Sequence, residues 1–301
     1  MTITRFRDLA EKAGAMSQKT VMAVIEAQDE NTIRAVLEAA GHGITRPAFI
    51  GKTSEIKELI TMLGSDPSDY EIIRSCDVVE SLKKAVDMIH TGKATALMKG
   101  KIGTAEFLKA VVNKENRLLT GSRLSLAALY ETKNYHKVFA VSDVGVNIYP
   151  DFDCKRSIVE HAVGMMVGLG KIRPKVAILA AVEKVNPKMP ETVDADALKK
   201  MYQNGGIKNC IIEGPISFDL ATSAKAAGIK GYDSPVAGDA DLLIVPDIVS
   251  GNVLVKCLTG MAGATTAGTV LGAKVPIVLT SRSAETSDKY YSIALAACLG
   301  G

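Results

Sequence analysis

The chain has 301 residues, of which 47% are hydrophobic and 23% charged, and its formal net charge is +3. These proportions are typical of a folded globular protein and exclude a disordered chain. Lysine and arginine form no dense block, so we expect no bulk binding to nucleic acid. Aromatic residues make up only 5%, which predicts a core of Ala, Val, Ile and Leu.

The first part of the chain alternates short β-branched runs with longer segments of helical periodicity. In chain order, the predicted strands and the helices that follow them are 21–25 with 30–40, 47–50 with 54–63, 70–73 with 81–90, and 94–98 with 104–112. This alternation predicts parallel strands joined by crossover helices.

The second part of the chain repeats the alternation. The predicted strands are 176–180, 210–212, 242–245 and 275–279, and the predicted helices are 194–203, 218–227, 252–258 and 283–298. The polar segment 147–156 is irregular, either as a passage between two lobes or as a loop. Two lobes are expected because a single core rarely grows beyond about 250–300 residues.

Metal, disulfide and membrane signals are weak. The five cysteines form no CxxC pair, which favours free thiols in a reducing cytosol, and the four histidines lie at no metal-ligand spacing. No apolar run reaches the roughly 18 residues of a membrane span, and the N-terminal segment predicts an amphipathic helix instead of a signal peptide. We therefore expect a cytoplasmic protein without membrane association.

Segments that directly follow predicted strands are the candidate sites, because open α/β sheets bind ligands beyond the carboxyl ends of their strands. After strand 94–98 come Lys99-Gly100-Lys101-Ile102-Gly103-Thr104. The lysines and the free N–H groups of the next helix are suited to an anion, and Thr104 is suited to cap that helix. A strand–helix turn with solvated lysines explains the same residues.

Two other segments pair an arginine with hydroxyls. Arg123 lies between Ser122 and Ser125 and is suited to bind a phosphate or carboxylate bidentately, although an exposed loop arginine is the simpler interpretation. In the segment 280–288, within which the last predicted helix begins, Ser281, Arg282 and Ser283 lie at the N-terminus of that helix, where they can form a phosphate or oxyanion cradle.

Asp288 lies about one turn into that last helix. A carboxylate beside a phosphate site is electrostatically unfavourable unless it has a chemical role. The alternative is an ordinary helix start, with a Ser or Thr N-cap and an acidic residue near the positive end of the helix dipole. The glycine-rich segment 260–272 fits neither common phosphate-binding motif, and close helix packing explains it equally well.

With these residues in view, the chain resembles the phosphate acetyl/butyryltransferase family, and most closely its butyryltransferase branch. The resemblance covers nearly the whole sequence. It is carried by ALMKGKIGTAEFLKAV (96–111), VSDVGVNIYPD (141–151), AVEKVNPKMPETVDA (181–195), EGPISFDLA (213–221), PVAGDADLLIVPDIVSGN (235–252) and GAKVPIVLTSRS (272–283).

The resemblance implies a two-lobed α/β/α fold with a parallel sheet, similar to the isocitrate and isopropylmalate dehydrogenases, with the active site in the cleft between the lobes. We expect one lobe in residues 1–137 plus 270–301 and the other in 138–269. The implied reaction is the reversible transfer of a butyryl or other short acyl group between coenzyme A and inorganic phosphate. Coenzyme A, acyl phosphate and phosphate are then substrates, and no cofactor or metal is expected.

The resemblance also assigns roles to individual residues. Ser281, Arg282 and Asp288 match the family's catalytic Ser-Arg pair and its downstream Asp. Arg123 matches a further family arginine. Substrate-binding positions are expected at Lys99, Thr104, Lys109, Asn252, Lys256 and Ser283, where Lys109 is the nearest candidate for a family arginine that this chain lacks.

Alternative functions remain open from the sequence. The acetyl-preferring sister activity is the nearest, because no single residue reveals the acyl pocket. A dehydrogenase of the same fold would need a carboxylate cluster for a divalent metal. A non-catalytic domain that senses coenzyme A or acyl phosphate is a third possibility, against which the retained Ser281, Arg282 and Asp288 argue. The Ala-rich, aromatic-poor composition, together with the resemblance, predicts a homo-oligomer.

Overall fold

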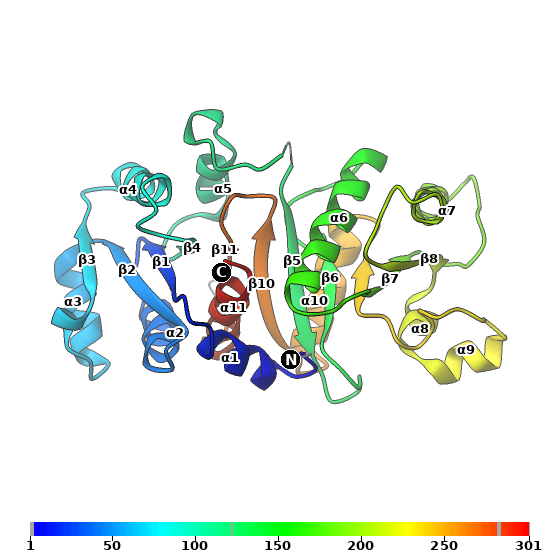
Figure 1. Cartoon of the computed structure of the whole chain (residues 1–301), viewed down its shortest axis with the longest axis horizontal. Coiled ribbons are helices and arrows are strands. Elements are labelled where there is room, and N and C mark those ends of the chain that lie inside the picture. Colours follow the sequence, from blue (N-terminus) through cyan, green and yellow to red (C-terminus); the bar gives the residue numbers. More distant parts are fainter. Residues whose placement is uncertain (1–2, 122, 282–283, 301) are drawn as a thin grey trace. The chain divides into compact units, whose positions relative to one another are not determined.

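The computed structural model of the chain describes residues 3–121, 123–281 and 284–300. It shows an α/β protein whose chain divides into two compact units (Figure 1). The terminal unit consists of Phe6–Ser122 and Thr266–Gly301, and the central unit consists of Met1–Arg5 and Arg123–Thr265. These bounds differ from those of the expected lobes mainly in the segment 123–137.

The terminal unit contains strands in the spatial order β3-β2-β1-β4-β11-β10. Their bounds are β1 Thr20–Ile25, β2 Thr45–Gly51, β3 Glu71–Arg74, β4 Ala96–Lys99, β10 Thr265–Leu271 and β11 Ile277–Val278. Neighbouring strands are parallel except β10, which runs antiparallel to β11. β1 and β4 are almost completely buried, as is typical of parallel strands covered by helices on both faces.

Helices cover both faces of these strands. Their bounds are α1 Phe6–Gly14, α2 Glu30–Gly41, α3 Thr53–Met62, α4 Val78–His90, α5 Thr104–Val112 and α11 Thr286–Leu299, with short 3-10 helices η1 Pro67–Asp69 and η2 Lys114–Asn116. In Figure 1, α2, α3 and α11 lie on one side of the strands, and α4 and α5 lie on the other. α11 packs against α1 and α2 and is buried over most of its length, which holds its first turn close to the end of β11.

The central unit contains strands in the order β5-β6-β9-β7-β8. Their bounds are β5 Ser125–Glu131, β6 Phe139–Ser142, β7 Lys175–Leu179, β8 Ile211–Ile216 and β9 Leu242–Ile244. β5 is antiparallel to β6, and the other neighbours are parallel. The core includes Val141, Ala177, Ile216 and Leu243, one from each of the parallel strands.

The helices of the central unit are α6 Phe152–Gly168, α7 Pro190–Gln203, α8 Phe218–Thr222, α9 Ala224–Lys230 and α10 Ile248–Gly260.

The connections that follow the neighbouring strands β7 and β9 run in opposite directions along the sheet. β7 continues through α7 to its outer neighbour β8, whereas β9 is followed by α10, which contacts β6 on the far side of β9. In open α/β sheets, such a switch in direction leaves a ligand-sized crevice beyond the carboxyl ends of the strands.

The predicted fold class is confirmed, but several local predictions are wrong. The segment 147–156 is not irregular throughout, because Asp151 accepts a hydrogen bond from the backbone of Cys154 and so caps α6, which begins at Phe152. The glycine-rich segment 260–272 contains β10, a strand. The predicted helix 218–227 is interrupted at Ser223, which caps α9. β5 and β6 were not predicted.

None of the helices in the part of the chain that the structure describes is long and apolar enough to cross a membrane. All five cysteines are free thiols, and three of them are buried: Cys154, Cys210 and Cys298. Within the described residues there is no cluster of three or more His, Cys, Asp or Glu side chains suited to a metal ion.

Candidate functional site

The segment between β11 and α11 carries the residues with the strongest predicted chemistry. β11 lies parallel to β4, so the carboxyl ends of these strands open at the same edge. Ser281 is exposed in this segment, just before α11. Arg282 and Ser283, which complete the predicted anion cradle, lie outside the described residues.

Asp288 lies in the first turn of α11 and is half-buried. Its Oδ1 accepts a hydrogen bond from the backbone N–H of Thr266 at 3.0 Å. Burial raises the pKa of Asp288, and this effect outweighs the hydrogen bonds from the backbone of Thr266 and Glu285, which lower it. The carboxylate is therefore a stronger base than an exposed Asp.

A cavity of about 550 Å³, here called the β4/α11 cavity, lies where β4 and β11 end. It is lined by Gln28, Asp29, Glu30, Thr32, Leu59, Lys99, Gly100, Lys101, Thr280, Ser281 and Lys289. Lys99 and Ser281, both predicted from the sequence, thus share one cavity. Asp288 precedes Lys289 directly in the chain.

Lys99 and Lys289 bring buried positive charge to the β4/α11 cavity, since they are only 4% and 3% exposed. Lys99 Nζ donates to the carbonyl oxygens of Gly100 at 3.2 Å and Ile102 at 3.1 Å. Lys289 Nζ donates to the carbonyl of Ala284 at 3.2 Å. Each ammonium group therefore holds the loop that follows one strand and adds charge suited to an anion.

The loop after β4 differs in detail from the prediction. Thr104 is the first residue of α5 but does not cap it, because Gly103 occupies the N-cap position and no side chain accepts a capping hydrogen bond. Residue 100 has no room for a side chain, because a Cβ atom there would lie 2.3 Å from the carbonyl oxygen of Glu26. The glycine thus lets the chain pack on the end of β1.

Lys109 lies apart from the β4/α11 cavity. It is exposed on α5 and lines a different cavity of about 890 Å³ with residues of α4 and η2, among them His90 and Asn116. The two cavities share none of their lining residues. The expected role of Lys109 as a replacement for a family arginine stays a prediction.

The remaining predicted residues belong to the central unit. Arg123 Nη2 lies 3.4 Å from Asp151 Oδ2, so this arginine is joined to the residue that caps α6. Asn252 and Lys256 are exposed on α10 and lie one helical turn apart, which places them on the same face. Their predicted roles in substrate binding stay predictions.

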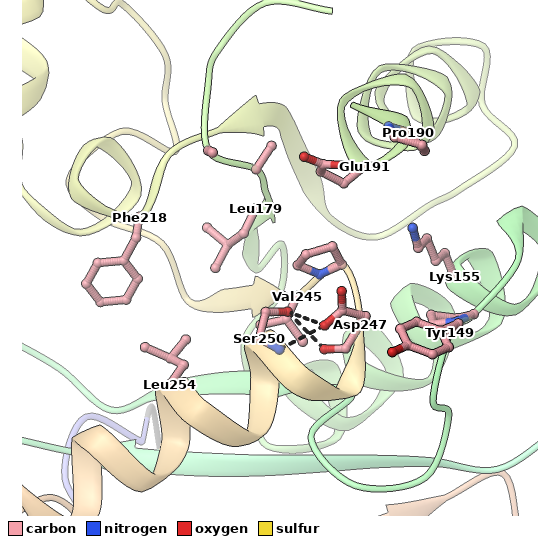
Figure 2. Close-up of a pocket in the computed structure, with 14 residues that line it drawn as sticks. Tyr149, Lys155, Leu179, Pro190, Glu191, Phe218, Val245, Asp247, Ser250 and Leu254 are labelled. Atoms are coloured by element: carbon pink, nitrogen blue, oxygen red, sulfur yellow. Dashed lines mark hydrogen bonds between the residues drawn. The ribbon is translucent and has the colours of Figure 1, made fainter. Parts of the chain in front are cut away.

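The central unit contains a second cavity, the α7/α10 pocket, of about 650 Å³. It opens beyond the carboxyl ends of β7 and β9, between the first turns of α7 and α10 (Figure 2). Its lining residues are Tyr149, Pro150, Lys155, Leu179, Ala180, Ala181, Pro190, Glu191, Phe218, Val245, Pro246, Asp247, Ser250 and Leu254. Gly251 allows α10 to begin here, since a Cβ atom at this residue would lie 2.9 Å from the carbonyl oxygen of Asp143.

Residues 76–297 match the model of a protein family described as phosphate acetyl/butaryl transferase. The chain belongs to the phosphate acetyl/butyryltransferase family. The match includes all residues that line the α7/α10 pocket, and it includes Lys99, Gly100, Lys101, Thr280, Ser281 and Lys289 of the β4/α11 cavity.

The similar proteins include both butyryltransferases and acetyltransferases. The chain is 40% identical over 299 residues to a phosphate butyryltransferase of Clostridium acetobutylicum, covering 99% of each chain. It is also 40% identical over 289 residues to a phosphate acetyltransferase of Thermotoga maritima, covering 96% of this chain and 97% of the relative. This family member is therefore similar to both branches.

Solved structures agree with the fold. A branched-chain phosphotransacylase from Enterococcus faecalis superposes with a TM-score of 0.82 at 32% identity, covering 93% of this chain and 99% of the other. A protein from Salmonella typhimurium named as a putative 4-hydroxythreonine-4-phosphate dehydrogenase matches with a TM-score of 0.60 at 14% identity, over 94% of this chain and all of the other. This second likeness shows the dehydrogenase-like fold alone.

Sequence reasoning missed Lys289 and the α7/α10 pocket. The signal for Lys289 was the one basic residue in the sequence of α11, TSDKYYSIALAACL, whose second half is entirely apolar. The pocket residues lay inside the sequence runs that carry the family resemblance, but they were assigned no chemistry. Their side chains converge because the segments that carry them follow β7 and β9, which are neighbouring parallel strands whose carboxyl ends lie at the same edge.

Proposed function

We propose that this family member catalyses the reversible transfer of a short acyl group, butyryl in the first place, between coenzyme A and inorganic phosphate. Membership of the phosphate acetyl/butyryltransferase family supports this function. The structural observation that carries it is a half-buried Asp288 with a raised pKa, next in the chain to a lysine of a cationic cavity that Ser281 also lines.

Asp288 is proposed as the general base for the coenzyme A thiol. A thiol has a pKa near about 8.5 and an ordinary Asp one near about 3.9, so complete proton transfer between them would cost roughly 6 kcal/mol. The raised pKa of Asp288 reduces this difference. Transfer of the proton as the sulfur attacks the carbonyl carbon reduces the barrier further.

In the direction of acyl-coenzyme A formation, the thiol sulfur attacks the carbonyl carbon of the acyl phosphate. The C–S bond forms, the thiol proton passes to Asp288, and the C–O bond to the phosphate breaks. In the other direction, a phosphate oxygen attacks the thioester and Asp288 returns the proton to the departing sulfur. The groups needed are a base, an anion site and donors for the carbonyl oxygen.

The anion site is proposed at the β4/α11 cavity. Lys99 and Lys289 supply positive charge there, and Arg282 is proposed to stabilise the leaving phosphate through a charge-assisted contact worth about 1.5–3 kcal/mol. Ser281 is proposed to donate to the carbonyl oxygen as negative charge develops on it.

Phosphate acetyltransferase is the second candidate function, because the relative from Thermotoga maritima is as similar as the butyryltransferase from Clostridium acetobutylicum. A release assay for free thiol, run with butyryl- and acetyl-coenzyme A in the presence and absence of phosphate, tests both. Phosphate-dependent release supports an acyltransferase, and the ratio of kcat/KM values assigns the acyl group. No release with either thioester would favour a ligand-sensing domain.

We further propose a homo-oligomeric cytoplasmic enzyme that needs no cofactor. The free state of all five cysteines supports a reducing compartment. Light scattering after size exclusion tests the oligomeric state, and activity after treatment with a chelator tests the expected independence from metal.

A further inference from the structure

The α7/α10 pocket has no part in the chemistry proposed so far. It lies at the point where the connections after β7 and β9 diverge, which is where open α/β sheets hold ligands. Its volume of about 650 Å³ is within the range of roughly 300–1,000 Å³ of small-molecule sites. A four-carbon acyl chain would fill only a small part of it.

The pocket has an apolar end and a polar end (Figure 2). Phe218, Leu179 and Leu254 lie at the apolar end. Tyr149, Lys155, Glu191 and Asp247 lie at the polar end. Phe218 is the first residue of α8 and is 41% exposed, so its ring presents an uncovered apolar face. A ligand with apolar groups at one end and hydrogen-bonding groups at the other would match this lining.

The charges at the polar end disfavour an anion. Lys155 Nζ lies 2.7 Å from Asp194 Oδ2, so this cation is already paired with a carboxylate. Asp247 uses Oδ1 to accept from the backbone and the hydroxyl of Ser250 at 2.8 and 2.9 Å, and Oδ2 takes part in neither bond. Glu191 is half-buried and pairs with no cation among residues 3–121, 123–281 and 284–300. The carboxylates of Asp247 and Glu191 therefore favour a neutral ligand that donates N–H or O–H groups.

Coenzyme A has one part with these properties. Its nucleotide end carries phosphates at both sides of the ribose, which the carboxylates would repel. Its pantetheine arm is neutral, with amide N–H groups, a hydroxyl and a pair of methyl groups on one carbon. We infer that the α7/α10 pocket binds the pantoyl part of this arm, with the methyl groups at the Phe218 end and the donors facing Asp247 and Glu191.

This inference rests on the proposed function, because it takes coenzyme A as the substrate. The experiment compares thioesters of one acyl group that are shortened stepwise: butyryl-coenzyme A, S-butyryl-pantetheine and N-acetyl-S-butyrylcysteamine. The last lacks the pantoyl part. Phe218→Ala removes the apolar face, and Glu191→Gln removes a charged acceptor with little change in shape.

Each variant is expected to raise KM for butyryl-coenzyme A and S-butyryl-pantetheine by about tenfold, which corresponds to about 1.4 kcal/mol. KM for N-acetyl-S-butyrylcysteamine, KM for phosphate and kcat are expected to stay within twofold. Matched controls are Ile229→Ala, an exposed apolar residue of α9, and Glu160→Gln, an exposed residue of α6, neither of which lines the pocket. Both controls are expected to behave like the wild type.

Other outcomes would overturn the inference. A rise in KM for butyryl-coenzyme A alone would assign the pocket to the nucleotide end. An equal rise for all three thioesters, growing with acyl length, would assign it to the acyl chain. No change in any KM would remove the pocket from substrate binding.

Direct binding separates this inference from the proposed function. Titration calorimetry with pantetheine is expected to show binding to the wild type that Phe218→Ala weakens by about tenfold. If the wild type shows no phosphate-dependent thiol release, the proposed function fails, and the pantetheine titration still decides whether the pocket recognises this chemistry. Absence of pantetheine binding to an active wild type would contradict the inference.

Discussion

The backbone N–H of Thr266 donates a 3.0 Å hydrogen bond to Asp288 Oδ1, which joins the start of β10 to the first turn of α11. This bond fixes the orientation of a carboxylate whose pKa is raised chiefly by burial. The bond stabilises the ionised form, but it does not offset the loss of solvent around the carboxylate. Asp288 is thus held in place and is basic, which are the properties required of a general base.

Asp288→Asn is expected to lower kcat by about 10²–10⁴, the usual contribution of a general base, while coenzyme A still binds. The amide oxygen can still accept from Thr266, so the fold should be kept. Because the raised pKa means that folding disfavours the ionised form, the variant should unfold at pH 7 at a temperature no lower than the wild type. Steady-state kinetics and thermal unfolding measure both effects, and near-normal turnover would exclude Asp288 from the mechanism.

The pH dependence of the reaction provides a separate prediction. Asp288 must be ionised to accept the thiol proton, so kcat/KM for coenzyme A with butyryl phosphate should fall as the pH drops through the pKa of this residue. Because burial raises that pKa, the acidic limb should lie above about 3.9, the ordinary value for Asp. The limb should be absent from the residual activity of Asp288→Asn. An unchanged limb in this variant would assign it to another group.

The buried ammonium groups of Lys99 and Lys289 at the β4/α11 cavity should determine the affinity of the protein for phosphate. Lys289→Met removes a buried ammonium group and keeps an apolar stem, so we expect a folded protein whose KM for phosphate is raised about tenfold, the lower end of the contribution of a charge-assisted bond. Lys57→Met, at an exposed lysine of α3, is the matched control. Equal KM values for phosphate in both variants would argue against an anion site here.

Arg282→Gln tests the residue on which the resemblance depends most. We expect a higher KM for phosphate and butyryl phosphate and a lower kcat, because the amide cannot provide the positive charge of the guanidinium. The measurement is a pair of saturation curves. In one, phosphate is varied at a fixed concentration of butyryl-coenzyme A, and in the other, butyryl-coenzyme A is varied at a fixed concentration of phosphate. A phosphate dependence equal to that of the wild type would contradict the assigned role.

A buried charge cluster should stabilise the central unit. Asp241 Oδ1 lies 2.8 Å from Lys137 Nζ and 3.0 Å from Lys171 Nζ, and the Asp241 side chain is 6% exposed. Burial alone would raise the pKa of Asp241, but the hydrogen bonds from Lys137, from the backbone of Lys175 and from Lys171 outweigh it, so the pKa is lowered. Asp241→Asn is expected to reduce the free energy of unfolding by about 1–3 kcal/mol at pH 7, because Lys171 loses its carboxylate partner and Lys137 keeps only Asp239.

Urea unfolding as a function of pH provides the check on this cluster. A lowered pKa stabilises the fold above the ordinary pKa of Asp, and this contribution is lost as the pH falls through the lowered value. The difference between wild type and Asp241→Asn should therefore shrink under strongly acidic conditions. Asp233→Asn, at an exposed position, is the control. A constant difference at all pH values would show that the charge of Asp241 is not its cause.

The sequence by itself determined the α/β class and the order of most elements. Buried parallel strands such as β1 appear as continuous apolar runs, and the helices that follow them have a clear periodicity. It also placed Ser281 and Asp288 near the start of a helix, because hydroxyl and acidic residues gather at helix N-termini. Local patterns were less informative where glycine and threonine dominate, as in β10, or where an Asp caps a helix within a polar stretch, as Asp151 does.

Only the tertiary structure decided which of these residues share a site. Lys99 and Ser281 come from distant parts of the chain and meet because β4 and β11 are neighbouring parallel strands. Lys109 follows Lys99 closely in sequence but lies in another cavity, because α5 carries it away. The basicity of Asp288 and the acceptors of the α7/α10 pocket likewise depend on burial and convergence. These properties arise from contacts between segments distant in sequence, which no local pattern records.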